Sequence, residues 1–563
     1  MKLKGAEVLL ECLKEQEVNV IFGYPGGTVL PIYDALYDRK DIKHIITAHE
    51  QGATHAADGY ARATGKVGVV IATSGPGATN TVTGIATAYR DSVPIVVITG
   101  QVSRDLLNKD SFQEVDIINI TKSITKKNYQ VKDIEDIPKI VREAFEIARS
   151  GRPGPVLIDI PKDLQAMTME YEPKCIDISF KPEKDICYND DYKEELRIRL
   201  KDAVEIINKS EMPMIFAGGG VNISGANKEL LEFAEKIKAP VTCSLMGLGA
   251  FPGTHPYFTG MVGMHGTKCS NIAINKCDVL IAIGVRFSDR VVSNKESFAK
   301  NAKIIHIDID KREFGKIIEN DIELWGDIKN ILNIFNKEVK EKEESEWNKQ
   351  IQYFKENYPL KYKNNGGVSP KKVLEKLYEL TNGKAIITTE VGQNQIWAAQ
   401  FYKYSEPRTF ISSGGLGTMG YGLSAAIGVS IGRPDAKVIN IAGDGSFKMN
   451  SIELATISRN KLPIIQIVFN NHALGMVRQW QDLFYNGRFF ETTLQPDVDF
   501  VDLAKAYKIK AIRIEEDNQI EGALIEGLKS NEPMLIECDI NCDDKVFPIV
   551  PPGEPINNII EEI

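Results

Sequence analysis

Residues 438–480 decide the fold, and they read VINIAGDGSFKMNSIELATISRNKLPIIQIVFNNHALGMVRQW. Two apolar runs in this stretch, 438–442 and 464–469, have the length and composition of buried parallel strands. Polar residues follow each run, GDGS after the first and NN after the second. Because ligands of open α/β sheets bind beyond the carboxyl ends of the strands, the stretch predicts an α/β fold with a site at one edge of a sheet.

The polar residues after the two strands suit a divalent cation. Asp444 offers a carboxylate and Asn471 an amide oxygen, while the glycines beside Asp444 let the backbone approach a phosphate closely. A hard cation such as Mg²⁺ takes oxygen ligands and commonly bridges a carboxylate to a diphosphate. The pattern therefore predicts that Asp444 and Asn471 hold a metal whose other ligands are diphosphate oxygens.

The GDG turn, a gap of 24 residues and the NN pair resemble the fingerprint of enzymes that use thiamin diphosphate (ThDP). The fingerprint implies three Mg²⁺ ligands: the side chains of Asp444 and Asn471 and the main-chain carbonyl of Ala473. A GDG turn alone is common, and two ordinary turns are the alternative interpretation. The spacing, the flanking strands and the NN pair together favour the cofactor site.

Length and composition set the broad class of the protein. A chain of 563 residues is too long for one hydrophobic core and predicts about three domains. The formal net charge of −9 argues against a nucleic-acid partner. We expect no membrane span, because no apolar run reaches about 18 residues, and no signal peptide. The eight cysteines include no CxxC pair, which favours reduced, mostly buried thiols in a cytoplasmic protein.

Three segments of the chain alternate apolar strands with helical patterns, which is typical of doubly wound parallel α/β sheets. We expect three such domains and a proline-rich tail that lies over the surface or a site: 1–170, 190–340, 368–545 and, for the tail, 546–563. The charged stretch 172–193 predicts a linker, and the lysine- and glutamate-rich stretch 336–349 predicts one solvated helix.

Glu50 is the main candidate for catalysis in the first segment. It follows the second expected strand and begins a helix, where a carboxylate ordinarily interacts with the helix dipole. ThDP needs a carboxylate on N1′ of its aminopyrimidine, so beside a ThDP fingerprint the catalytic interpretation of Glu50 is favoured. Later in this segment, residue type alone predicts that Phe112 lies in a core and Gln113 on the surface.

Glycine-rich turns and acidic strand ends mark the middle segment. Gly218 and Gly219 follow its first strand, the motifs MHG (264–266) and RFSDR (286–290) follow at later strand or loop ends, and Asp308 ends a further strand. Backbone N–H groups in such turns bind phosphates, and a carboxylate binds ribose hydroxyls. The segment therefore predicts a nucleotide site, with a purely structural domain as the alternative.

The glycine-rich motif GGLGTMG (414–420) of the third segment fits GxGxxG at Gly415, Gly417 and Gly420. It lacks a clean preceding strand and an acidic residue about 20 positions on, so we reject a dehydrogenase interpretation. The P-loop pattern GxxxxGK[ST] does not occur either. Met476 and Trp480 are four residues apart and share one face of a helix, which favours a role in lining the site over core packing.

Nine motifs together resemble one family over essentially the full length of the chain. They are YPGG, HEQGA, SGPGATN, FQE, MHG, RFSDR, GGLGTMG, GDGSF and NNHALGMVRQW. The chain closely resembles the catalytic subunits of acetohydroxyacid synthase (acetolactate synthase), which are ThDP enzymes. The resemblance implies pyrimidine-binding, FAD-binding and diphosphate-binding domains in that order. It also implies a homodimer or dimer of dimers with Glu50 facing the partner's metal site, and a small regulatory subunit as a further partner.

The resemblance assigns roles to individual residues. It implies that ThDP is bound by Gly392, Gln393, Met419, Gly445, Ser446, Gly475 and Met476, in addition to Glu50. It implies that FAD is bound by Gly218, Gly219, Met264, His265, Gly266, Arg286 and Asp308. Gln113 and Phe112 would lie at the reacting centre with Lys162 near its entrance. Arg290 would bind the carboxylate of the second substrate, and Trp480 would border its side chain.

Four positions depart from the family pattern. Ser288 replaces the first aspartate of RFDDR, Thr28 a usual alanine, Ser103 a usual proline and Asn394 a common histidine. These departures concern the substrate channel and the rims of the cofactor sites, so they affect fine geometry and inhibitor sensitivity and not the class of reaction.

The activity that the resemblance implies is carboligation. Two pyruvates give 2-acetolactate and CO₂, and pyruvate with 2-oxobutyrate gives 2-aceto-2-hydroxybutyrate, which feeds valine, leucine and isoleucine synthesis. The alternatives are pyruvate oxidase, which uses its flavin, and a flavin-free catabolic acetolactate synthase. A non-enzymatic flavin- or nucleotide-binding regulator would need neither Glu50 nor the pair of GDG and NN.

Overall fold

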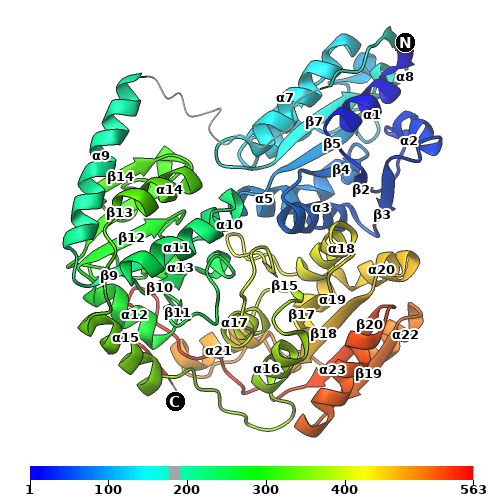
Figure 1. The fold of residues 1–563 in the computed structure, drawn as a ribbon. Helices are drawn as coiled ribbons and strands as arrows, with labels where there is room; N and C mark the ends of the chain where they lie inside the picture. The colour runs from blue at the N-terminus through cyan, green and yellow to red at the C-terminus, as the bar shows by residue number, and fades with distance from the viewer. Residues whose placement is uncertain (176–189, 562–563) are drawn as a thin grey trace.

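Three six-stranded sheets follow one another along the chain in the computed structural model, which describes residues 1–175 and 190–561 (Figure 1). All strand pairs inside the three sheets are parallel, as expected of doubly wound α/β folds, so the predicted fold class is confirmed. In Figure 1 the first sheet lies in the blue and cyan part, the second in the green part and the third in the yellow to red part. No described helix has both the length and the apolarity that a membrane span requires.

The first sheet has four expected apolar strands at its centre and two strands at its edges that are more polar. Its order is β3 (Lys43–Ile46), β2 (Val20–Gly23), β4 (Gly68–Ala72), β5 (Ile95–Gln101), β7 (Val156–Pro161) and β6 (Lys127–Gln130). Its helices are α1 (Gly5–Glu15), α2 (Leu30–Tyr37), α3 (Glu50–Thr64), α4 (Pro76–Asn80), α5 (Val82–Asp91), α6 (Ile117–Thr121), α7 (Ile137–Arg149) and α8 (Lys162–Ala166). A short antiparallel pair, β1 (Lys2–Lys4) with β8 (Thr168–Glu170), joins the two ends of this segment.

The second sheet has a strand order that reverses in its middle. The order is β11 (Phe258–Met261), β10 (Val241–Cys243), β9 (Pro213–Ala217), β12 (Val279–Ile283), β13 (Lys303–Asp308) and β14 (Ile322–Trp325). Its helices are α9 (Asp190–Lys209), α10 (Gly219–Ser224), α11 (Asn227–Ile237), α12 (Lys268–Lys276), α13 (Asp289–Val292), α14 (Ile328–Glu338) and α15 (Glu346–Asn357). This is the 3-2-1-4-5-6 order of dinucleotide-binding folds, with its switch point between β9 and β12.

The third sheet repeats the strand order of the first. The order is β16 (Phe410–Ile411), β15 (Ile386–Thr389), β17 (Val438–Gly443), β18 (Ile464–Asn470), β20 (Met534–Asp539) and β19 (Lys510–Ile514). Its helices are α16 (Pro370–Thr381), α17 (Gln393–Phe401), α18 (Gly422–Gly432), α19 (Asp444–Asn450), α20 (Leu454–Asn460), α21 (Gly475–Phe484), α22 (Phe500–Ala506) and α23 (Ile520–Lys529). Both sheets therefore have a switch point at the same place, between β2 and β4 in the first sheet and between β15 and β17 in the third.

Two charged stretches differ from their predicted structure. The stretch 336–349 is not one helix: α14 ends at Glu338, Val339 is buried, and Ser345 caps the start of α15. The chain leaves the helix because Lys342 donates to the main-chain carbonyls of Ile207 and Ser210 instead of facing solvent. Most of the predicted linker, 176–189, lies outside the described residues, but its end is helical, since α9 begins at Asp190.

The residues after β20 return to the middle domain. The Val550 N–H donates to the carbonyl of Met264 at 2.8 Å, and Asn271 Nδ2 donates to the carbonyl of Ile556 at 2.8 Å. Lys268 and Glu561 form an ion pair at 2.7 Å. The tail thus covers the MHG motif, which agrees with the expectation that it lies over the surface or a site.

The first and third sheets share one hydrophobic core, in which α3 crosses α18. The crossing is close because each helix has a glycine at the contact. A Cβ atom at Gly428 would lie 1.7 Å from the carbonyl oxygen of Ala56, and a Cβ atom at Gly59 would lie 2.2 Å from that of Ala425. Any side chain at these positions must push the two helices apart.

We therefore expect Gly428→Ala to lower the free energy of unfolding by about 3 kcal/mol or more, beyond the usual cost of an added methyl group in a core. The matched control is Gly522→Ala in α23, where a Cβ atom would meet nothing within 4 Å. That substitution should be neutral or stabilise by up to about 1 kcal/mol through helix propensity. Urea denaturation of both variants measures the difference, and equal midpoints would contradict the close crossing.

Candidate active site

Asp444 lies at the carboxyl edge of the third sheet, where β17 and β18 are neighbours. Its side chain is buried, and its Oδ1 atom has no hydrogen-bond partner. Burial raises the pKa of the carboxyl group to about 7. A buried carboxylate oxygen without a donor is costly, and a cation bound to it would remove that cost. The residue therefore fits a metal ligand.

Asn471 follows β18 and lies in a group of residues from three segments. Its Oδ1 atom accepts from the Ala473 N–H at 3.2 Å, and its Nδ2 donates to Gln393 Oε1 at 3.3 Å. A Cβ atom at Gly475 would lie only 2.0 Å from Gln393 Oε1, so any larger residue there must displace the Gln393 side chain. Gln393 in turn donates to Gln479 Oε1 at 3.0 Å. The structure thus brings together four predicted site residues that are up to 82 positions apart in the sequence.

A metal at this edge would have few protein ligands. Among the described residues, no group of three or more His, Cys, Asp and Glu side chains is arranged to hold an ion. Asp444 offers one carboxylate, Asn471 an amide oxygen and Ala473 a carbonyl. The remaining ligands of a Mg²⁺ ion would have to come from water or from a bound phosphate, as is usual for this cation.

Glu390 is a functional candidate to which the sequence assigned no role. It is fully buried after β15, and burial raises the pKa of its carboxyl group. Its oxygens accept from the N–H groups of Gly420 and Leu423 at 2.8 and 3.0 Å, and from Ser446 Oγ at 2.8 Å. Glu390 thereby fixes the end of the GGLGTMG motif, which carries Met419, against the GDGSF turn, which carries Gly445 and Ser446.

Glu50 begins α3 at the carboxyl edge of the first sheet. Its Oε2 atom accepts from Asn80 Nδ2 at 3.0 Å, and a Cβ atom at Gly77 would lie 3.3 Å from its Oε1. Gln113 packs on the same turn, since a Cβ atom at Gly75 would lie 2.9 Å from its Cα. In the part of the chain that the structure describes, no hydrogen bond or ion pair joins Glu50 to Asp444 or its neighbours.

Phe112 and Lys162 are less enclosed than Glu50 and Gln113. Phe112 is 88% exposed, so the core position expected from its residue type is wrong. Its ring is open to a ligand or a partner. Lys162 is also exposed and begins the short helix α8. The structure therefore brings Glu50 and Gln113 to one turn and leaves Phe112 and Lys162 at the surface of the single chain.

The middle sheet offers a second site at its switch point. Gly218 and Gly284 lie so close that a Cβ atom at Gly218 would meet the Gly284 carbonyl oxygen at 2.1 Å, and Gly219 begins α10 beside them. Asp308 ends β13, and burial raises the pKa of its carboxyl group to about 7. Close backbone approach with an acidic strand end is the arrangement that binds dinucleotides.

The MHG motif lies under the C-terminal tail. His265 Nδ1 lies 3.1 Å from the Pro548 carbonyl, and burial lowers the pKa of the imidazole to about 4. Met264 is buried, and a Cβ atom at Gly266 would lie 2.7 Å from the carbonyl oxygen of Met261. These three predicted flavin residues therefore form a tight, covered turn.

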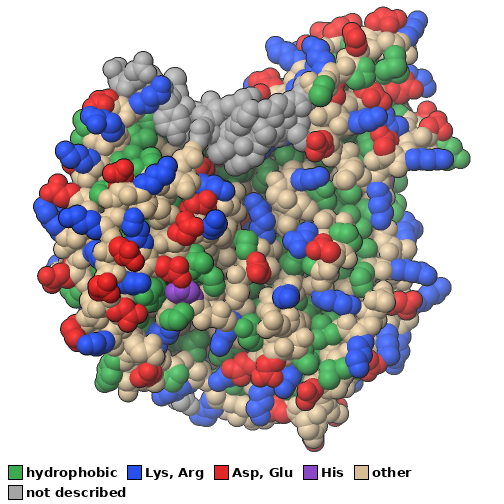
Figure 2. Space-filling model, viewed as in Figure 1, with side chains coloured by type: hydrophobic (Ala, Val, Ile, Leu, Met, Phe, Trp, Pro, Cys, Tyr) green, Lys and Arg blue, Asp and Glu red, His purple; other side chains and the backbone are tan. Residues whose placement is uncertain are grey.

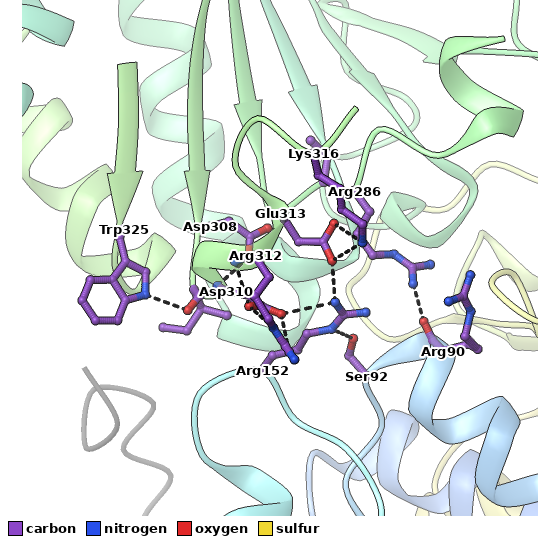
Figure 3. Close-up of polar contacts among 12 residues, drawn as sticks. Arg90, Ser92, Arg152, Arg286, Asp308, Asp310, Arg312, Glu313, Lys316 and Trp325 are labelled. Atoms are coloured by element: carbon purple, nitrogen blue, oxygen red, sulfur yellow. Dashed lines mark hydrogen bonds and ion pairs between the residues drawn. The ribbon is translucent and has the colours of Figure 1, made fainter. Parts of the chain in front are cut away.

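Arg286 and Arg152 link the first and middle sheets, as Figure 3 shows. Arg286 donates to the Arg90 carbonyl at 2.5 Å, and burial lowers the pKa of its guanidinium. Arg152 donates to Glu313 Oε1 at 2.8 Å and to Ser92 Oγ at 2.8 Å. The predicted flavin residue Arg286 thus lies at the contact between the two domains.

Arg290 and Trp480 come from different domains and meet. The Arg290 guanidinium lies over the Trp480 ring, 5.6 Å from its centroid, and Trp480 packs edge-on against Phe484. The Arg290 side chain is exposed and approaches Met264 Sδ at 3.9 Å. Met476, one helical turn before Trp480, packs on the core of the third sheet. A cation beside a half-buried aromatic ring suits an anionic ligand with an apolar side chain.

Of the four departures from the family pattern, Thr28 and Asn394 have structural accounts. Thr28 Oγ1 contacts Thr73 Oγ1 at 2.9 Å and accepts from the Ser74 N–H at 3.0 Å, which joins the YPGG and SGPG turns. Asn394 Nδ2 donates to the carbonyls of Glu390 and Ile441 at 3.0 and 2.9 Å. Ser288 precedes α13 without a side-chain cap, and nothing in the structure explains Ser103.

Comparisons with known proteins agree with this arrangement. Three domain models of thiamine pyrophosphate (ThDP) enzymes match the chain: the N-terminal TPP binding domain at 3–120, the central domain at 200–334 and the C-terminal TPP binding domain at 390–538. The probable acetolactate synthase large subunit of Methanocaldococcus jannaschii is 49% identical over 100% of this chain and 96% of its own length. The acetolactate synthase isozyme 2 large subunit of Escherichia coli (strain K12) is 42% identical over 100% of both chains.

Three parallel sheets and two matched TPP binding domains define a ThDP-dependent enzyme. Within that class, full-length identity shows that the chain belongs to the family of acetolactate synthase large subunits. The predicted family is therefore confirmed.

The Thr28 contacts lead to a stability prediction. We expect Thr28→Ala to lower the free energy of unfolding by about 1–2 kcal/mol, because the Ser74 N–H and the Thr73 hydroxyl lose a buried partner. Thr28→Ser keeps the hydroxyl and is the control, so it should retain most of the stability. Denaturant titration of both variants measures this, and a Thr28→Ala variant as stable as the wild type would contradict the role of the hydroxyl.

Proposed function

We propose that this chain condenses two molecules of pyruvate to 2-acetolactate and CO₂, and pyruvate with 2-oxobutyrate to 2-aceto-2-hydroxybutyrate. This is the first common step of valine, leucine and isoleucine synthesis. The observation that carries the proposal is Arg290 over Trp480, beside the helix that follows the NN pair. A ThDP enzyme that ligates a second 2-oxo acid needs a cation for its carboxylate and an apolar border for its side chain.

We propose that the third sheet binds the diphosphate of ThDP through Mg²⁺. Asp444, Asn471 and Ala473 would hold the ion, and Gly392, Gln393, Met419, Gly445, Ser446, Gly475 and Met476 would contact the cofactor. The orphaned Asp444 oxygen supports this assignment. When bound, ThDP supplies the nucleophilic carbon and the electron sink for decarboxylation of a 2-oxo acid. Gln393 is held in place by Asn471, Gln479 and the Asp544 carbonyl.

Glu50 would act on a ThDP molecule held by a partner chain. Its carboxylate would hold a proton against N1′ of the aminopyrimidine, and Asn80 would orient that carboxylate. The absence of a bond between Glu50 and the Asp444 group within the described part of the chain supports a site built by two copies. We therefore propose a homodimer or dimer of dimers, and a small regulatory subunit as a further partner.

We propose that the middle domain binds FAD at its switch point and that the flavin has a structural role, without net redox change. Gly218, Gly219, Met264, His265, Gly266, Arg286 and Asp308 would contact it. The 3-2-1-4-5-6 strand order and the buried Asp308 carboxylate support the assignment. The three domains would span 1–170, 190–340 and 368–545, with the tail 546–563. The free thiols of the seven described cysteines fit a cytoplasmic enzyme.

The reacting centre would combine groups from all three domains. Gln113 and Phe112 would face the substrates, Lys162 would lie near the entrance, and Arg290 would pair with the carboxylate of the second substrate. An Arg–carboxylate pair is bidentate and charge-assisted, so it fixes the orientation of the acid. The cofactor requirement separates such an enzyme from the alternatives that the sequence offered, a pyruvate oxidase and a flavin-free synthase.

The decisive experiment uses the purified chain with pyruvate, ThDP, Mg²⁺ and FAD, with each cofactor omitted in turn. We expect acetolactate to form without oxygen, to require ThDP and Mg²⁺, and to continue with a redox-inactive flavin analogue. Oxygen consumption with stoichiometric flavin reduction at each turnover would instead identify an oxidase. Full activity without any flavin would identify the flavin-free synthase.

For catalysis, we expect Glu50→Gln to lower turnover by about 10²–10⁴-fold, because the amide cannot exchange a proton with N1′. The proton at C2 of bound ThDP should then exchange more slowly with deuterium, which NMR of quenched samples measures. Glu15→Gln is the control: this carboxylate has little exposed surface and is paired with Arg142, and it lies in a different part of the first domain. Normal exchange in Glu50→Gln would refute the assigned role.

For specificity, we expect Arg290 and Trp480 to have separable roles. Arg290→Gln should weaken the use of both second substrates, because both have the carboxylate. Trp480→Leu should lower the preference for 2-oxobutyrate over pyruvate by roughly 10–200-fold, the value of one methylene in an apolar pocket. Competition between the two acids, with both products measured, tests this. An unchanged product ratio in Trp480→Leu would mean that the ring only packs against Phe484.

A further inference from the structure

The loop of residues 413–420, called here the glycine loop, runs between the two predicted cofactor sites. At its start, a Cβ atom at Gly414 would lie 2.3 Å from Met246 Sδ, and Met246 also packs beside Gly219, a predicted flavin residue. At its end, the Gly420 N–H donates to Glu390 and to Ser446, a predicted ThDP residue. One short loop therefore contacts both regions.

A carboxylate of the first domain holds the start of this loop. Asp91, the last residue of α5, accepts from the Gly415 N–H at 2.7 Å and from the Gly414 N–H at 3.1 Å. Its second oxygen also accepts from Arg62 Nη2 at 2.9 Å, and its side chain has no exposed surface. Both oxygens of Asp91 are therefore used inside a buried site.

The end of α5 also holds Arg286 in place. Arg286 Nη1 donates to the carbonyl of Arg90, the neighbour of Asp91, as drawn in Figure 3. A Cβ atom at Gly415 would meet Asp91 Oδ1 at 2.5 Å, the Arg90 carbonyl oxygen at 3.0 Å and Arg286 Nη2 at 3.1 Å. Residues 90 and 91 thus hold the glycine loop and a predicted flavin residue side by side, and neither is itself a predicted cofactor contact.

Helix α5 contacts the loop a second time near its end. Thr87 Oγ1 lies 2.8 Å from Thr418 Oγ1, and both side chains are buried. The Thr418 N–H donates to Ser413 Oγ at 3.0 Å, which closes the loop on itself. The loop is therefore held by one helix at both of its ends, and Met419 lies directly after the second contact.

We propose that Asp91 is a positioning residue that orders the glycine loop for the binding of both cofactors, ThDP at the Met419 end and the flavin at the Arg286 end. Two backbone N–H groups of the loop donate to this carboxylate, and Arg62, which also pairs with Asp58, donates to its second oxygen. Without the carboxylate, the loop amides lose their partners, and the loop leaves the position that both cofactors require. This inference rests on the proposed function of the chain.

The test compares Asp91→Asn with Asp159→Asn in the full chain. Asp159 is a matched control: it is a buried aspartate of the first domain that accepts from Thr99 and Gln101, away from the glycine loop. Calorimetry with ThDP and Mg²⁺, and flavin fluorescence with FAD, measure the two dissociation constants on protein that circular dichroism shows to be folded. We expect Asp91→Asn to raise both constants at least tenfold, as for the loss of hydrogen bonds to a charged group.

Asp159→Asn should leave both constants within about twofold of the wild type, and turnover of Asp91→Asn should largely recover at saturating cofactors. An unchanged pair of constants in Asp91→Asn, a change in only one of them, or an equal change in Asp159→Asn would each overturn the proposal. If Asp91→Asn does not fold, Thr87→Val takes its place, and it must raise both constants. A wild-type chain that binds no flavin would overturn the proposed function and this inference together.

Discussion

The close crossing of α3 and α18 is the contact on which the rest of the structure depends. It joins the first and third sheets into one core, and glycine on both helices brings backbone against backbone. Helix α3 carries Glu50 at its first residue and Arg62 near its last, while α18 begins directly after the glycine loop. The crossing therefore sets the distance between a candidate catalytic carboxylate, the ion pair of Arg62 with Asp91, and the loop that Asp91 holds.

Buried carboxylates mark the places where this fold is organised for binding. A buried carboxylate usually accepts hydrogen bonds from nearby donors, and Glu453 is an example. It accepts from the N–H groups of Ala48 and His49, just before Glu50. Glu390 and Asp91 are likewise satisfied by backbone amides. Asp444 differs, because one of its oxygens has no donor although the residue is buried. Among these four carboxylates, the difference separates three that hold the protein together from the one that fits a cation.

The sequence was most informative where strands are buried on both faces. The expected strands 438–442 and 464–469 differ from β17 and β18 by one residue at their ends, since continuous apolar runs have clear limits. Strand β6 has no clear signal in the sequence, because it lies at a sheet edge and its residues, KNYQ, are polar and partly exposed. The prediction of one helix at 336–349 was wrong, because charged residues alone do not show that Lys342 donates to a buried main-chain carbonyl.

Roles that depend on distant contacts were also beyond the sequence. The sequence assigned no role to Glu390, because its partners are 30 and 56 residues away. Asp91 lies 324 residues from Gly415, and no local pattern links a helix end to that loop. By contrast, Arg290 and Trp480 were assigned to one substrate through the resemblance, and the structure brings their side chains together.

The repeated strand order of the first and third sheets gives a physical reason for the proposed site shared between chains. Each sheet has a switch point at its carboxyl edge, one carrying Glu50 and the SGPG turn, the other carrying Gln393 and Asp444. The shared core fixes these two edges relative to each other within a chain, and no described bond joins their functional groups. The edge of the first sheet offers a candidate proton acceptor, Glu50, without a set of metal ligands. The edge of the third sheet offers the candidate metal ligands without such a proton acceptor. Two copies of the chain arranged about a twofold axis would give each edge its complement twice, which is why a symmetric dimer suits this fold better than a monomer.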